Sequence, residues 1–201
     1  MEGIYFYWLF WIGWVYTTFL LRKTKERLVI GAGILLLIIL SSRHLVVGEY
    51  IVNGTIALSL LIGYYLISKN RVGVVVFFLC VSIISTISYV TFRLFQLYDP
   101  VWVMFHPTLK LSFLLVILIL VLVKDQQMRI ALLFVTVAQG ELVYTIFLST
   151  IVPEFLIGQR ESLDIIAITS CIIFLWYAFE RLVTLLDELV KKRTVLRTSR
   201  R

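Results

Sequence analysis

The sequence contains apolar runs that are too long for the core of a water-soluble domain. Seven of them, about 18 to 24 residues each, are long enough at 1.5 Å per residue to cross a hydrocarbon layer of about 30 Å. Backbone groups in lipid must find their partners within the segment, and the runs lack the alternation of a β-barrel, so helices are expected. The segments are 3–21, 28–47, 50–68, 72–92, 101–123, 130–151 and 163–186.

These segments predict an all-α fold, a polytopic bundle of seven transmembrane helices over residues 1–186. A basic tail, 187–201, is expected to continue the last helix. The composition agrees, because 61% of the residues are hydrophobic and only 15% are charged, whereas a soluble domain has about 25% charged residues. A soluble globular fold is therefore excluded.

The positions of Lys and Arg predict the orientation. Fourteen of the nineteen lie in the first, third and fifth links and in the tail, and three (Arg43, Arg93 and Arg160) lie in the other links. Cytoplasmic links are enriched in these residues, so the N-terminus is expected outside and the tail in the cytoplasm. The net charge of +7 is spread over links and tail, which favours anionic lipid headgroups as partners and argues against nucleic acid.

Two charged residues are expected near the bilayer midplane. Lys110 lies ten residues into the fifth segment and Glu141 twelve into the sixth, and each charge there costs about 3 kcal/mol unless it is paired. The sequence therefore predicts a pair between Lys110 and Glu141. His106 shares a helix face with Lys110, and Pro107 between them is expected to kink the helix.

This candidate intramembrane site has two interpretations. His106, Lys110 and Glu141 could form a proton relay or a buried substrate site. Alternatively, the pair could be a structural lock between two helices.

A second candidate cluster lies toward the outer face. It consists of Arg43, Glu49, Arg93 and Asp99. Both arginines are expected near segment ends, where their guanidinium groups could pair with the carboxylates or hold an anionic ligand.

Small residues mark one face of the third segment. Thr55, Ser59 and Gly63 recur at four-residue spacing, a pattern that lets helices approach closely. Close packing is the favoured interpretation, and a pore lining is the alternative.

The signatures of common enzymes are missing from the sequence. It has no phosphate-binding glycine loop, no His-Glu-x-x-His and no Gly-x-Ser-x-Gly. Two histidines and two separated cysteines offer no metal site. We therefore expect neither catalysis nor a cofactor.

The opening Met1-Glu2-Gly3-Ile4-Tyr5-Phe6-Tyr7-Trp8 and the later Trp14-Val15-Tyr16-Thr17-Thr18-Phe19 resemble the YphA-type small membrane proteins of Bacillus and relatives. The resemblance implies a plasma-membrane location in a Gram-positive cell, and it implies no activity and no site residues.

Two functions follow as hypotheses. The first is a non-enzymatic membrane component that acts through protein or lipid partners in the cell envelope. The second is a small carrier or proton-coupled transporter that uses the Lys110 and Glu141 pair together with His106.

Overall fold

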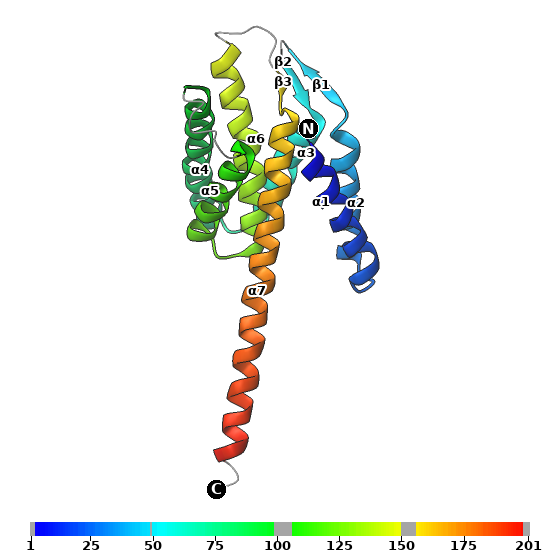
Figure 1. Cartoon of the computed structure of the whole chain (residues 1–201), viewed down its shortest axis with the longest axis vertical. Helices are drawn as coiled ribbons and strands as arrows, with labels where there is room; N and C mark the ends of the chain where they lie inside the picture. The colour runs from blue at the N-terminus through cyan, green and yellow to red at the C-terminus, as the bar shows by residue number, and fades with distance from the viewer. Residues whose placement is uncertain (1–2, 49, 99–105, 150–155, 199–201) are drawn as a thin grey trace.

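The computed structural model describes residues 3–48, 50–98, 106–149 and 156–198, which form a helical bundle with a small sheet at one end (Figure 1). The helices are α1 (Ile4–Val15), which continues as a π-helical turn (Tyr16–Leu20), α2 (Lys25–Leu40), α3 (Gly54–Ser68), α4 (Val72–Tyr98), α5 (Pro107–Leu122), α6 (Gln126–Ser149) and α7 (Arg160–Thr198). The strands are β1 (His44–Val47), β2 (Tyr50–Asn53) and β3 (Leu156–Ile157).

Three of the described helices are long and apolar enough to cross a membrane. They are α4, α6 and α7 over Arg160–Glu188, whereas the helices over Ile4–Leu20, Gly54–Ser68 and Pro107–Leu122 are apolar but shorter. This supports a membrane-embedded helical protein. The expectation of seven spans stays a prediction, because several helices are shorter than the segments read from the sequence.

The main error in the sequence-based boundaries is a hairpin that was expected to be helix. Residues 44–47 and 50–53 were assigned to the second and third spans, but they form the antiparallel pair β1 and β2. Both strands are rich in β-branched residues, and Gly48 between them has φ +63°, a conformation that favours glycine and suits a tight hairpin. β3 joins β2 in parallel, so the sheet order is β1-β2-β3.

Other boundaries also differ. α4 continues six residues beyond the expected end at Phe92, and α7 begins three residues before Leu163 and runs to Thr198. Within the tail, Lys191 Nζ lies 3.0 Å from an Asp187 carboxylate oxygen, an ion pair at i,i+4 spacing.

Pro107 is the first residue of α5 and not a kink within it, so that prediction was wrong. A proline at the first position of a helix removes an N–H that would have had no intrahelical partner anyway. Residues 101–105, the start of the expected fifth span, lie outside the described residues.

The core of the bundle is built around α6. Every residue from Ala131 to Ala138 is buried, on all faces of the helix, because α3, α4, α5 and α7 pack around it. Gly63 on α3 permits one of these contacts, since a Cβ there would lie 2.6 Å from Val135 Cγ2. The small face of Thr55, Ser59 and Gly63 is buried in the packing of the bundle and does not line a pore.

The first helix is held to the bundle by a carboxylate from the last. Asp164 of α7 is buried and accepts hydrogen bonds from the backbone N–H groups of Gly3 and Phe6, both at 2.7 Å. These N–H groups belong to the start of α1, where no residue preceding the helix supplies a side-chain cap. Asp164 therefore caps α1 from a distant helix and complements its dipole.

Candidate functional site

The most concentrated charge inside the bundle lies where α4, α5, α6 and α7 meet. We call this group the Arg93 network. Its members are Tyr89 and Arg93 of α4, Thr108 of α5, Glu141 and Tyr144 of α6, and Glu161 of α7.

Arg93 is the centre of the network and is only 5% exposed. Its Nη2 lies 3.0 Å from Glu141 Oε1 and its Nη1 lies 2.6 Å from Glu161 Oε2. Its guanidinium carbon lies 5.2 Å from the centre of the Tyr144 ring, within the range of a cation–π contact. One guanidinium thus joins three helices, a geometry that a planar fork of donors provides and a lysine does not.

The carboxylate of Glu141 is 1% exposed and has a second donor. The Tyr89 hydroxyl donates to the same Oε1 at 2.5 Å. Tyr89 can come this close because the facing residue is Gly140, where a Cβ would lie 2.8 Å from Tyr89 Cγ and closer still to Cδ1. The small residue on α6 therefore sets the spacing at which the tyrosine reaches the carboxylate.

Glu161 completes the network at the start of α7. The Thr108 hydroxyl of α5 donates to Glu161 Oε1 at 3.4 Å, so the first turn of α5 lies beside this carboxylate. The positive end of a helix dipole stabilises a negative charge at that position. With both carboxylates ionised, the Arg93 network holds one cation and two anions.

The predicted trio of His106, Lys110 and Glu141 is not brought together. Glu141 takes Arg93, and not Lys110, as its ionic partner. Lys110 lines a cavity between α4 and α5, and His106 is exposed at the residue preceding α5. The predicted pairing of Lys110 with Glu141 was therefore wrong, although Glu141 does have a cationic partner.

The predicted outer cluster is also divided. Arg43 is exposed beside β1, while Arg93 is buried in the network described above. Glu49 and Asp99 lie outside the described residues. Sequence reasoning placed Arg93 in a link because it ended the fourth helix at Phe92. The extra turn and a half of α4 puts Arg93 within the bundle.

A second ion pair, which the sequence analysis missed, lies at the other end of the bundle. Arg129 of α6 is buried, and its two terminal nitrogens lie 3.1 and 3.2 Å from the two oxygens of Glu180 on α7. Its Nε donates to the Val123 carbonyl at 2.9 Å, and Trp176 Nε1 donates to Glu180 at 2.6 Å. This pair ties α7 to the connection between α5 and α6.

A third polar group runs across the middle of the bundle. Gln139 of α6 donates to the Tyr64 hydroxyl of α3 at 2.5 Å and accepts from the Thr86 hydroxyl of α4 at 3.2 Å. Both oxygen and nitrogen of this amide are thus satisfied, as a polar group within an apolar bundle requires. Among the described residues, no group of three or more His, Cys, Asp or Glu side chains could hold a metal ion.

Comparison with known proteins gives matches over nearly the whole chain. The family model described as YphA-like integral membrane protein matches residues 2–199. The chain is 28% identical over 193 residues to a Bacillus subtilis (strain 168) protein whose printed name is "Uncharacterized protein YphA", and the match covers 96% of each chain. No solved structure matches. The chain therefore belongs to the YphA-like integral membrane protein family.

Proposed function

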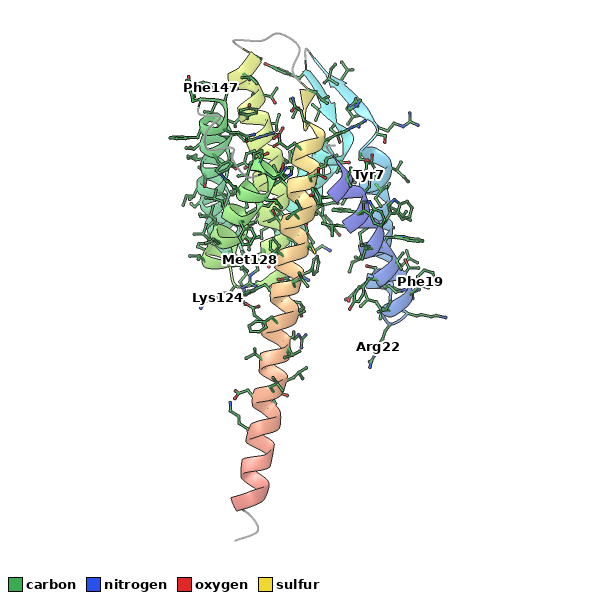
Figure 2. All side chains as sticks on the ribbon, in the orientation of Figure 1. Tyr7, Phe19, Arg22, Lys124, Met128 and Phe147 are labelled. Atoms are coloured by element: carbon green, nitrogen blue, oxygen red, sulfur yellow. The ribbon has the colours of Figure 1, made fainter. Side chains whose placement is uncertain are left out.

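We propose that this protein is a seven-span component of the bacterial plasma membrane that acts, without catalysis, by binding a partner protein on the cytoplasmic part of α7. The topology is supported by the position of the cationic links. Arg22 and Lys124 lie at the end of the bundle away from the strands (Figure 2), and the C-terminus of α7 points the same way (Figure 1). The excess of positive residues at that end would make it the cytoplasmic side.

The observation that carries the proposal is the length of α7. It has 39 residues, or about 58 Å at 1.5 Å per residue, nearly twice what a bilayer core of about 30 Å requires. Figure 1 shows α7 continuing past the end of every other helix. Its contacts with the bundle include the pair of Glu180 with Arg129, and the helix continues for 18 residues beyond Glu180, to Thr198.

The extension has an apolar face on which none of the described residues packs closely. Leu182, Val183, Leu185 and Leu186 are between 47% and 58% exposed. At 100° per residue they occupy one side of the helix, and Glu180, which binds the bundle, occupies the opposite side. The apolar face therefore points away from the bundle. We place the end of the seventh span near Glu180, about 20 residues or 30 Å from the start of α7 and before the predicted end at Leu186. The apolar face then lies in water, where it favours association with another amphipathic helix.

The charge of the tail indicates which side chains the partner helix should carry. The last eleven residues contain six cations and no carboxylate side chain, Lys191, Lys192, Arg193, Arg197, Arg200 and Arg201. Two parallel copies of α7 would bring these like charges together, which opposes self-association. Headgroups contribute little, because Lys191 is eleven residues beyond Glu180, about 16 Å along the helix, and the Debye length is about 8 Å. A partner helix that is amphipathic and acidic would fit both the exposed apolar face and the positive charge of the tail.

Site-specific photocrosslinking in living cells tests the proposal. A photoreactive residue at Leu186 is expected to crosslink to a second protein that carries an acidic helix, and the same residue at Thr184, on the polar side, is not. The substitution Lys191→Glu should reduce the yield at Leu186. Equal yields at both positions, or crosslinks to a second copy of this chain, would contradict the proposal.

Proton-coupled transport is a second candidate, supported by the Arg93 network. A single cation shared by two carboxylates inside a membrane protein leaves a formal excess of one negative charge, which uptake of a proton would neutralise. Proton flux into liposomes that contain the purified protein tests this. Glu161→Gln should abolish the flux, whereas Glu26→Gln at the exposed start of α2 should not. Flux that is equal in empty liposomes eliminates this candidate.

A further inference from the structure

Three fully buried hydroxyl groups inside the bundle have no hydrogen-bond partner among the described residues. They are Ser85 Oγ of α4, Thr136 Oγ1 of α6 and Thr169 Oγ1 of α7, and each of these residues is 0% exposed. The Nε of Arg93, a residue that is 5% exposed, also has no partner within the described part of the chain. Buried polar groups are normally hydrogen-bonded, and leaving one without a partner is destabilising. Four such groups in one bundle therefore indicate a further binding partner.

The hydroxyls of Ser85 and Thr136 lie on facing sides of α4 and α6. Tyr89 of α4 packs against Gly140 of α6. Ser85 is four residues before Tyr89 and Thr136 is four residues before Gly140, and residues four apart share a helix face. The two helices run in the same direction, because their hydrogen-bonded pairs occur in the same order along both. Both hydroxyls therefore lie one turn away from the contact of the tyrosine with the glycine, on the same side of it.

The third hydroxyl, that of Thr169, lies on the side of α7 that faces α6. Thr169 is eleven residues before Glu180, about three full turns, and Glu180 binds Arg129 of α6. Thr136 is seven residues after Arg129, about two turns along the same face of α6. The three hydroxyls are thus directed from α4, α6 and α7 into the region where these helices meet. This region lies between the Arg93 network and the pair of Arg129 with Glu180.

Water fits these groups better than an ion does. Each hydroxyl can donate one hydrogen bond and accept two, and Arg93 Nε can donate one, so the set offers both donors and acceptors. The charge of Arg93 is already bound by the carboxylates of Glu141 and Glu161, which would repel an anion. Internal waters typically make about three hydrogen bonds to buried polar groups that otherwise have no partner.

We propose that internal water molecules bind to Ser85, Thr136 and Thr169 and, through Arg93 Nε, hydrate the Arg93 network from the interior of the bundle. Water at this position lowers the cost of holding one cation and two carboxylates among apolar helices, because water penetration reduces the desolvation penalty of buried charges. The inference depends neither on the partner proposed for α7 nor on proton transport.

X-ray radiolysis of the full-length protein in a nonionic detergent tests the proposal, because hydroxyl radicals formed from bound internal water oxidise the side chains beside it. Tyr89 and Phe78 are a matched pair, since both are aromatic residues of α4 with 0% exposure. Tyr89 lies one turn from Ser85, whereas Phe78 lies about two turns away on the other side. We expect mass spectrometry to detect oxidation of Tyr89 and not of Phe78.

Two variants connect that oxidation to the hydroxyls. The double variant Ser85→Ala with Thr136→Val removes two of the groups that bind water and should lose the oxidation of Tyr89. Ser82→Ala is the control and should keep it, because the Ser82 hydroxyl on the same helix already donates to the Leu79 carbonyl at 2.9 Å.

Thr136→Val alone keeps the proposal testable if the double variant fails to fold, since the two side chains have nearly the same shape. Loss of a hydrogen bond to water should lower Tm by about 2 to 4 °C, whereas replacing a hydroxyl that has no partner should leave Tm unchanged or raise it. The proposal is overturned if Tyr89 is oxidised no more than Phe78, or if the double variant is oxidised like the wild type. It is also overturned if Ser82→Ala loses the oxidation as well, or if Thr136→Val does not lower Tm.

Discussion

Replacing Arg93 with Met is expected to destabilise the bundle strongly while keeping most of the side-chain volume. The substitution removes the contacts at 3.0 Å to Glu141 and at 2.6 Å to Glu161, together with the packing on Tyr144. Two carboxylates are then left together in an apolar environment without a cation. The cause of the destabilisation is the uncompensated charge more than the loss of attraction.

The size of the expected loss of stability follows from how deeply the two carboxylates are buried. Breaking a buried pair by removing one partner costs about 3 to 5 kcal/mol, and Glu141 qualifies because it is 1% exposed. Glu161 is more exposed, with 18% of its side chain accessible, so we assign its pair no more than about 1 kcal/mol. For a chain of about 200 residues, each kcal/mol corresponds to about 2 to 4 °C in Tm. We therefore expect a decrease of about 6 to 24 °C.

Thermal unfolding in detergent, followed by the loss of the monodisperse peak in size-exclusion chromatography, measures this shift. The double variant Arg93→Met with Glu141→Gln should recover a large part of the loss, because it removes the buried charge. Arg93→Lys should be intermediate, since one ammonium cannot donate to both carboxylates with fork geometry. Arg181→Met, at an exposed position on α7, is the control. The reasoning is refuted if Arg93→Met unfolds with the wild type, or if the double variant is no more stable than the single one.

Three other perturbations test the packing. Gly140→Ala places a Cβ against the Tyr89 ring and should cost about 1 to 3 kcal/mol, whereas Gly33→Ala, with open space around it, should be neutral or stabilising; equal effects in the same thermal assay would contradict this. Asp164→Leu removes the cap of α1 and should increase hydrogen exchange in the first turn of α1 but not in α6. Glu180→Gln should lower Tm more than Arg129→Met, because it leaves the buried Arg129 guanidinium without its carboxylate, whereas Arg129→Met leaves a Glu180 side chain that is 41% exposed; the reverse order would count against this reasoning.

The sequence by itself indicated that lipid, and not water, surrounds most of this protein. Apolar runs of about 20 residues exclude water as the surroundings of most of the chain, and backbone hydrogen bonding in lipid then requires helices. The same reasoning fails at residues 44–47 and 50–53, which are mostly apolar and partly β-branched and form a hairpin with Gly48 in its turn. Hydropathy alone does not distinguish a short strand at the end of the bundle from the end of a membrane helix.

Which charges meet was decided by the tertiary structure. From the sequence we predicted that Glu141 lies near the midplane and needs a cation, and that Lys110 on the preceding helix supplies it, but the structure supplies Arg93 from α4. The depth of a charged residue depends on where its helix ends, and an error of six residues at the end of α4 moved Arg93 out of the bundle. Neighbours in a bundle are set by packing around α6, through close contacts such as Tyr89 on Gly140. Spacing along one chain does not encode contacts between helices that are distant in sequence, so only the folded structure can assign them.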